Sequence, residues 1–313
     1  MTSFGITNGP APARLTAGIV SAGRVGTAVG AALERAGHVV SACSAVSSAS
    51  VARAVKRLPD TEILPAADVA ARSELLILAV PDDQLADLVR GLAATHAVKP
   101  GTLVAHTSGA NGIAILTPLT ELGALPLAIH PAMTFTGHDE DTARLSSACF
   151  GITAADDIGY AIAQSLVLEI GGEPVRVREE NRALYHAALA HGSNHLVTLV
   201  VDAVEALRAS LQGDELLGQQ LVDGDPGGVA ERVLQPLLSA ALDNALRRGP
   251  SALTGPVARG DAAAVDTHLR VLTDLDPELA AGYRAMSLRS AQRVGAPTEL
   301  FDILTETGGD RRE

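Results

Sequence analysis

A short glycine-containing turn is the first feature of this sequence that could bind a ligand. It reads Ser21-Ala-Gly23-Arg-Val-Gly26 and follows an apolar run at residues 15–20. In dinucleotide-binding folds, a Gly-x-Gly-x-x-Gly turn brings backbone N–H groups to a pyrophosphate and begins a helix. Serine stands here in place of the first glycine, and an ordinary strand-to-helix turn is the alternative. The predicted cofactor-binding residues are Ser21, Ala22, Gly23, Arg24, Val25 and Gly26.

The end of the next predicted strand indicates which nicotinamide cofactor would bind. NAD-binding domains usually carry Asp or Glu there, which binds the ribose hydroxyls. This chain reads CSAVSS at residues 43–48 and has no carboxylate. The hydroxyls of Ser44, Ser47 and Ser48 can donate to a 2′-phosphate, and Arg24 and Arg53 are candidate cationic partners. We therefore predict NADP(H), with a solvated serine turn as the alternative.

Ligands of open α/β sheets bind beyond the carboxyl ends of the strands, where further candidates stand. Ala79, Val80 and Pro81 end the most apolar strand and can face the nicotinamide ribose without obstruction. The alternative is that these residues form an ordinary cap between a strand and a helix.

Two later strand ends carry groups that could act on a substrate. Thr107, Ser108 and Gly109 end one strand, where the Ser108 hydroxyl and nearby N–H groups could bind a carboxylate or carbonyl. His130 ends another, before Pro131, and is a candidate proton donor. For each of these segments, the alternative is that its residues only stabilise a turn.

Six segments occur in an order that resembles a bacterial family of Rossmann-like proteins with a helical C-terminal domain of unknown function. They are SAGRVGTAVGAALERAGHVV, LLILAVPDDQL, HTSGANG, LAIHPAMTF, YHAALAHGSNHLV and ALTGPVARGD. The family is similar to the superfamily of 6-phosphogluconate dehydrogenase, pyrroline-5-carboxylate reductase and ketopantoate reductase. The resemblance implies a Rossmann domain followed by an all-helical domain like that of 6-phosphogluconate dehydrogenase. Some members resemble an alternative type of ketopantoate reductase, which implies NADPH-dependent reduction of a 2-oxo acid.

Such a reduction needs a proton donor and fixed dipoles beside the oxygen that gains negative charge. In related dehydrogenases, a lysine on the first long helix of the second domain often donates, with an asparagine one turn later. This chain has two lysines, Lys56 and Lys99, so none lies in its second half. His186 is then the nearest donor, two turns before Asn194 and about 80° from it around the helix axis. We predict that His186 donates the proton and that Asn194 orients the substrate, with His130 as the second candidate donor. The alternative is that His186 and Asn194 only pack and form hydrogen bonds within the fold.

The segment TGPVARGD at residues 254–261 is unusual for a loop that joins helices. Arg259, with Thr254, is a candidate clamp for a substrate carboxylate. A salt bridge with Asp261 or a helix terminus would use Arg259 equally well. No Cys/His spacing typical of a metal site is present, so no metal is predicted.

These residues need a scaffold of alternating strands and helices, and residues 15–178 have that pattern. Strands are expected at 15–20, 38–43, 62–64, 74–80, 102–106, 125–129, 149–153 and 174–177. Because helical segments separate most of them, we predict an α/β fold with a Rossmann-type doubly wound, mostly parallel sheet.

No strand alternation appears after residue 180. Long helices are expected near 181–211 and 229–248, with shorter ones ending near 304. The predicted organisation is a flexible arm (1–14), a Rossmann NADP-binding domain (15–178), a helical substrate and dimerisation domain (179–305) and a tail (306–313).

Composition narrows the possible partners. The net charge is −12, from 24 basic and 36 acidic residues, and no basic cluster suited to nucleic acid appears. The first residues lack the apolar core of a signal peptide, and no segment is apolar enough to span a bilayer. Two cysteines, Cys43 and Cys149, indicate reduced thiols rather than a disulfide framework. We expect a cytoplasmic protein that binds a small molecule, no nucleic acid and no membrane, and that forms a homodimer through its alanine-rich helices.

Three functions remain open. The first is NADPH-dependent reduction of a small 2-oxo acid, with ketopantoate as the named candidate. The second is reduction of a cyclic imine of the pyrroline-5-carboxylate type. The third is a non-catalytic protein that senses NADP(H) or regulates a partner, which the missing lysine and the altered glycine turn favour.

Overall fold

The computed structural model describes residues 14–211 and 228–305. The chain divides into two compact units between Gly192 and Ser193, and each unit is considered by itself. The predicted arm and tail fall almost wholly on residues 1–13 and 306–313, outside the described residues.

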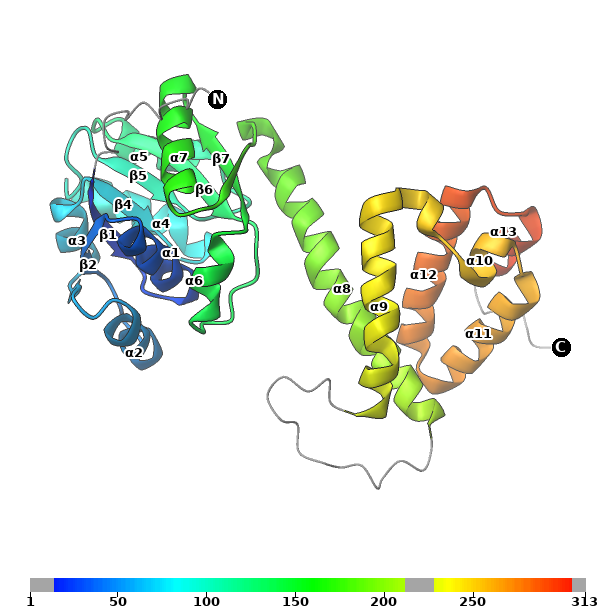
Figure 1. The fold of residues 1–313 in the computed structure, drawn as a ribbon. Coiled ribbons are helices and arrows are strands. Elements are labelled where there is room, and N and C mark those ends of the chain that lie inside the picture. The colour runs from blue at the N-terminus through cyan, green and yellow to red at the C-terminus, as the bar shows by residue number, and fades with distance from the viewer. Residues whose placement is uncertain (1–13, 212–227, 306–313) are drawn as a thin grey trace, which may run out of the picture. The chain divides into compact units, whose positions relative to one another are not determined.

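The first unit is built on one eight-stranded sheet in the order β3-β2-β1-β4-β5-β6-β7-β8 (Figure 1). The strands are β1 (Thr16–Val20), β2 (Val39–Cys43), β3 (Glu62–Ile63), β4 (Leu75–Leu78), β5 (Leu103–His106), β6 (Leu125–Pro131), β7 (Cys149–Ala154) and β8 (Glu173–Arg176). Only the β6–β7 pair is antiparallel. The strand order reverses between β1 and β4, as in a doubly wound fold, which confirms the predicted Rossmann-type sheet.

Helices cover both faces of this sheet, because its strands are apolar on both sides. Along β4, Leu75 and Ile77 belong to one core, and Leu76 and Leu78 to the other, as the two-residue period of a strand requires. The first core is completed by α1 (Arg24–Arg35), α2 (Ser48–Arg57), α6 (Glu140–Leu145) and α7 (Asp157–Glu169). The second is completed by α3 (Ala66–Arg72), α4 (Asp82–Ala94), the short helix η1 (Ile113–Leu116) and α5 (Thr117–Thr120).

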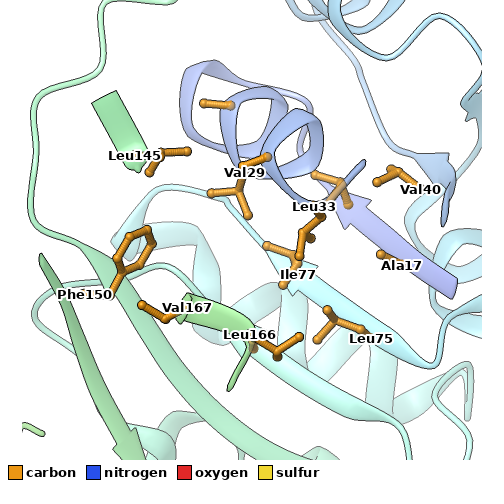
Figure 2. Packing of buried hydrophobic residues seen from close by; sticks show 14 of the residues in the cluster. Ala17, Val29, Leu33, Val40, Leu75, Ile77, Leu145, Phe150, Leu166 and Val167 are labelled. Atoms are coloured by element: carbon orange, nitrogen blue, oxygen red, sulfur yellow. The ribbon is translucent and has the colours of Figure 1, made fainter. Parts of the chain in front are cut away.

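The first core contains the only large aromatic side chain among its fully buried members, Phe150. Figure 2 shows Phe150 beside Val167 and Leu166, with Val29 of α1 and Ile77 of β4 nearby. A cavity of about 30 Å³ lies among these side chains. A core made largely of Ala, Val and Leu is here packed less tightly than it could be.

Two helices of the first unit begin directly after strand ends. Helix α1 begins at Arg24, directly after the glycine turn. Helix α4 begins at Asp82, with Pro81 as its N-cap and without a side-chain cap. Helix α1 is followed by Gly37 at a φ of 91°, as the glycine there predicts.

The second unit consists of helices and their connections, with no strand among its described residues. Helix α8 (Arg182–Ser210) crosses the division between the units, and after it come α9 (Val229–Arg248), α10 (Gly255–Arg259), α11 (Ala262–Leu275), α12 (Pro277–Val294) and α13 (Thr298–Thr305). A small core of Val265, Leu269, Ala291, Leu300 and Leu304 holds α11, α12 and α13 together. Among the described residues, no helix combines the length and apolarity that crossing a bilayer requires.

The division at Gly192 lies beyond the predicted boundary at residues 178 and 179. The sequence boundary marks the change from strands to helices, and β8 does end at Arg176. The first turns of α8 nevertheless belong to the first unit, because Arg182 at its start is buried among the strand ends.

Candidate functional site

The turn after β1 passes so close to α1 that only glycine fits at its last position. A Cβ on Gly26 would lie 2.1 Å from the carbonyl oxygen of Ser21. Ser21 itself has a φ of 76°, the left-handed conformation that glycine adopts most easily. The backbone therefore makes the complete fingerprint turn, with a serine where its first glycine would stand.

The amino terminus of α1 is open to an anion. Its N-cap is Gly23, which has no side-chain oxygen to accept the first N–H groups, and the first turn holds no acidic residue. Free N–H groups and the helix dipole favour negative charge at this point. The turn also lies where the strand order reverses between β1 and β4. These residues fit the diphosphate of a dinucleotide.

The serines after β2 have distinct structural roles. The Oγ of Ser44 accepts a hydrogen bond of 2.9 Å from the N–H of Ser21, and its carbonyl oxygen accepts one of 2.7 Å from Ala22. Ser47 is the N-cap of α2: its Oγ accepts from the N–H of Ser50, and its hydroxyl donates to the Ser50 hydroxyl. Ser44 therefore braces the turn, the Ser47 hydroxyl is used within α2, and Ser48 is exposed.

Arg24 of α1 and Arg53 of α2 both lie beside Gly137, and Arg57 follows one turn later on α2. A Cβ on Gly137, in the connection from β6 to β7, would lie 3.1 Å from Cγ of Arg24 and 4.0 Å from Cδ of Arg53. The side chain of Arg57 is only 5% exposed and donates to Thr142. Nε of Arg53 and Nη1 of Arg57 are buried and find no hydrogen-bond partner in the described part of the chain. Buried cationic N–H groups without acceptors are suited to a phosphate.

The ends of β4 and β5 lie side by side. The N–H of Ala79 donates to the carbonyl of Val20 at 2.9 Å, and the N–H of Thr107 donates to that of Leu78 at 3.1 Å. Ala79 and Val80 are half-buried, and Pro81 is exposed at the start of α4. This edge therefore continues from the glycine turn to the predicted substrate residues.

His106 fixes the turn that carries Ser108. Its Nδ1 accepts from the N–H of Ser108 at 3.2 Å, so its proton is on Nε2, which donates to the carbonyl of Gly112 at 2.8 Å. Burial lowers the pKa of His106 to about 4, and the ring is neutral at pH 7. The buried Oγ of Ser108 accepts from the N–H and the side-chain amide of Asn111 at 3.0 and 2.9 Å.

Arg182 is a buried cation behind this turn, with 2% of its surface exposed. Its Nε donates to Oγ1 of Thr153 at 2.7 Å, and its Nη2 donates to the carbonyls of Ala128 and Gly151 at 3.1 and 3.0 Å. Burial lowers the pKa of Arg182, yet a guanidinium remains charged at neutral pH. Arg182 thus joins β6, β7 and α8 and adds positive potential at this edge.

Two imidazole rings meet at Gly109, and a phenol contacts one of them. A Cβ on Gly109 would lie 2.9 Å from Nε2 of His130 and 2.9 Å from Cδ2 of His186. The two imidazole centroids are 6.5 Å apart. The Oη of Tyr185 lies 3.0 Å from Nδ1 of His130, on the opposite side of that ring. Both histidines therefore occupy the space that a side chain at position 109 would need.

The environment keeps two of these rings uncharged. Burial lowers the pKa of His130 to about 4, with further lowering by the Arg182 guanidinium and by His186. Burial also raises the pKa of Tyr185. At neutral pH the site therefore holds a phenol and a neutral imidazole, groups that can donate hydrogen bonds to a carbonyl oxygen.

The structure brings Ser108, Gly109, His130 and His186 together within the first unit. The other candidates belong to the second unit, where Asn194 is exposed on α8, Thr254 is the N-cap of α10 and Arg259 is exposed at the end of α10. Their roles stay predictions. Within residues 14–211 and 228–305, no group of three His, Cys, Asp or Glu side chains is arranged to hold a metal ion.

Sequence reasoning missed His106, Tyr185, Arg182 and Arg57. His106 directly precedes the predicted Thr107-Ser108-Gly109 turn, and Tyr185 directly precedes His186, so both stood next to residues already singled out. Arg182 and Arg57 carry no local signal, because their partners are 29 and 85 residues away in the chain.

Comparison with known proteins agrees with this geometry. A model of a Rossmann-like domain matches residues 1–131, and a model of the domain of unknown function DUF2520 matches residues 148–290. No curated protein matches the sequence.

Solved structures share the fold at low sequence identity. A candidate NADP oxidoreductase of Bacteroides fragilis is 20% identical with a TM-score of 0.70, over 89% of this chain and 98% of that one. A protein of Thermotoga maritima is 19% identical with a TM-score of 0.61, over 90% and 98%. Pyrroline carboxylate reductase of Plasmodium falciparum, with NADP bound, is 10% identical with a TM-score of 0.53, over 90% and 98%.

Proposed function

Since the chain joins a Rossmann-like domain to the domain of unknown function DUF2520, we propose that it is an NADP(H)-dependent oxidoreductase that reduces a small 2-oxo acid. Ketopantoate, which would become pantoate, is the named candidate substrate. The observation that carries the proposal is the packing of His130 and His186 against Gly109, with Tyr185 on the other nitrogen of His130. These residues lie on the same edge of the sheet as the glycine turn.

The cofactor would be held by the backbone of the turn and by cations beside α2. Ser21 to Gly26 and the open terminus of α1 fit the diphosphate. Arg24 and Arg53, which flank Gly137, support a 2′-phosphate and hence NADP(H) rather than NAD(H). Two solved structures of this fold, one named as an NADP oxidoreductase and one with NADP bound, agree with this choice. When bound, the nicotinamide supplies a hydride to the carbonyl carbon.

The residues at Gly109 would act on the carbonyl oxygen. As that oxygen gains negative charge, uncharged donors fixed beside it stabilise the charge and supply a proton. The buried Arg182 adds positive potential there, which favours a substrate with a carboxylate next to its carbonyl. In the turn Thr107-Ser108-Gly109, the N–H groups of Thr107 and Ser108 already donate to Leu78 and His106. The donors left for the same carboxylate are the Ser108 hydroxyl, whose oxygen accepts from Asn111, and the N–H of Gly109.

Binding and turnover test this function separately. Calorimetry with NADPH and NADH should give tighter binding of NADPH, and tighter binding of NADH would contradict the cofactor assignment. A panel of 2-oxo acids that includes ketopantoate should then consume NADPH, followed by its absorbance. Binding of NADPH without turnover on any acid or imine would favour a regulatory protein instead.

Reduction of a cyclic imine is the second candidate. It is supported by likeness in fold to an imine reductase of Pseudomonas, at 15% identity and a TM-score of 0.55. An imine is reduced fastest when protonated, and a neutral His130 beside Arg182 is poorly suited to stabilise that cation. Adding 1-pyrroline-5-carboxylate to the panel would decide between the two.

We place the protein in the cytoplasm, as a homodimer that binds neither nucleic acid nor membrane. Both cysteines are free thiols, which agrees with a reducing compartment. Helices α8 and α9 expose large apolar side chains, among them Val197, Leu237 and Leu246, and a second copy would cover them. Sedimentation velocity would test the dimer.

A further inference from the structure

We propose that Tyr185 is a positioning residue that holds His130 in the tautomer with its proton on Nε2, so that His130 rather than His186 gives the proton to the substrate oxygen. This inference rests on the proposed reduction and assigns its proton donor. It also gives Tyr185, which sequence reasoning did not select, a role at the same site.

The first support is the packing of the Tyr185 side chain against Gly151 and His130. A Cβ on Gly151 would lie 2.6 Å from the Oη of Tyr185, so the phenol occupies the place of a side chain that Gly151 lacks. Gly151 is paired with His130 across the antiparallel strands β6 and β7. The ring of Tyr185 meets that of His130 edge to face, with centroids 5.6 Å apart and planes at 90°. The phenol is therefore fixed against one nitrogen of His130, at 3.0 Å from Nδ1.

The hydrogen-bond partner of Tyr185 then decides the tautomer. Within the described part of the chain, the Tyr185 hydroxyl makes its hydrogen bond with Nδ1 of His130, at 3.0 Å. The phenol has one proton to donate, and Nδ1 accepts it when that nitrogen carries no proton of its own. A neutral imidazole has one donor and one acceptor, so the proton of His130 must then be on Nε2.

The two histidines face Gly109 with different atoms. His130 presents Nε2, whereas His186 presents the carbon Cδ2. His130 therefore directs a ring nitrogen toward Gly109, whereas the atom that His186 directs there is a carbon. The charged and titratable groups that act on His130 are Arg182, His186, Asp82 and His106, and Tyr185 contacts it directly.

The proton transfer balances without a charged imidazole. When the carbonyl carbon accepts a hydride with its electron pair, the carbonyl oxygen takes the proton from Nε2 of His130. Nδ1 of the same ring takes the proton of the Tyr185 hydroxyl, which leaves a phenolate and a neutral histidine. The guanidinium carbon of Arg182 is 5.7 Å from the centre of the Tyr185 ring, so a cation stands beside that phenolate. Water then returns a proton to Tyr185.

Nitrogen NMR of the protein without substrate tests the tautomer directly. In ¹⁵N-histidine-labelled protein near neutral pH, His130, assigned by its loss in His130→Gln, should show a protonated Nε2 and an unprotonated Nδ1. In Tyr185→Phe, which removes only the hydroxyl, the two nitrogens should move toward a mixture of tautomers. A protonated Nδ1 in the wild-type protein would overturn the proposal.

Kinetics provide the second measurement. Tyr185→Phe should lower kcat about 10²-fold, the usual range for losing general acid catalysis, with the Kd for NADPH unchanged. His130→Gln should lose at least as much, and His186→Gln should keep most turnover. Tyr160→Phe is the matched control, because Tyr160 lies on α7 and stacks with Arg176 instead. Unchanged kcat in Tyr185→Phe, or a larger loss in His186→Gln than in His130→Gln, would also overturn it.

Failure of the proposed function would look different. If neither nicotinamide cofactor binds, the oxidoreductase assignment fails, whatever the tautomer of His130. If NADPH-dependent turnover is found but His130 carries its proton on Nδ1, the oxidoreductase stands and the role of Tyr185 is wrong.

Discussion

Gly26 and Ser21 are in direct backbone contact, with no space for a side chain at Gly26. Because a Cβ there would collide with the Ser21 carbonyl at 2.1 Å, Gly26→Ala must displace the turn from α1. We expect the Kd for NADPH to rise at least about tenfold, which is about 1.4 kcal/mol, together with a lower Tm. Fluorescence titration and thermal unfolding measure the two effects.

Gly91→Ala is the control for that variant. Gly91 lies within α4, and its added Cβ would meet nothing within 4 Å. Replacing a helix glycine by alanine should stabilise the protein by about 0.5–1 kcal/mol and leave NADPH binding unchanged. Wild-type NADPH affinity in Gly26→Ala would show that the turn does not hold the cofactor.

Arg53 should distinguish the two nicotinamide cofactors. Arg53→Ala removes a guanidinium whose buried Nε has no partner among the described residues. Loss of a charge-assisted hydrogen bond to a phosphate should weaken NADPH binding by about 1.5–3 kcal/mol, while NADH binding stays unchanged. Calorimetry with both cofactors measures the change in preference. Arg35→Ala, at the exposed end of α1, is the control, and an equal loss for NADH would argue against a phosphate site.

Arg182 should be essential for the stability of the first unit. Arg182→Met leaves the carbonyls of Ala128 and Gly151 and the hydroxyl of Thr153 without their donor. We expect the free energy of unfolding to fall by about 3 kcal/mol or more. Urea unfolding followed by circular dichroism measures it. The exposed Arg178, 3.9 Å from Glu180, is the control, and Arg178→Met should change stability by less than about 0.5 kcal/mol.

Stability should fall as the solution becomes acidic. The pKa values of His106 and His130 are about 4 in the folded protein, below the value of 6.5 expected after unfolding. Between pH 6.5 and 4 the unfolded chain therefore binds protons that the folded protein does not, so stability is complete above this range and is lost within it. Each histidine contributes up to about 3 kcal/mol. Urea midpoints should drop over this range, less so in His130→Gln, and the same slope in both proteins would contradict the assignment.

The cavity in the first core can be filled. It measures about 30 Å³ and is lined by Val29 among other apolar side chains (Figure 2). Val29→Ile adds one methylene group and should stabilise the protein by about 0.8 kcal/mol, seen as a higher Tm. Val175→Ile, at a position 41% exposed, should have little effect. A lower Tm in Val29→Ile would mean that the space has the wrong shape for the added group.

Local sequence patterns predicted the scaffold well for a clear reason. Strands buried on both faces, such as Leu75–Leu78, are unbroken apolar runs, and α9 has the bounds that its sequence predicts, Val229–Arg248. The short helices η1, α5 and α6 were not predicted, because four to six residues are too few to show a helical period.

The site was predicted only where one segment carries the information. Gly26 and His130 can be selected from their neighbours in the chain, since a turn or a strand end is a local feature. The partnership of Tyr185 with His130 joins residues 55 positions apart, and it exists only because β7 brings Gly151 opposite His130. Likewise, Arg53 comes close to Gly137 and Arg57 donates to Thr142 only when the connection from β6 to β7 folds against α2.

Ser21 shows what a glycine fingerprint encodes. Its φ of 76° is reached by a residue that has a Cβ, at a cost of about 1 kcal/mol. A ligand at this turn would contact backbone N–H groups, so the residue type at position 21 matters less than its φ angle. Searches that require the glycine letter will pass over chains of this kind, and Ser21→Gly is a simple route to engineering a more heat-resistant form of the protein.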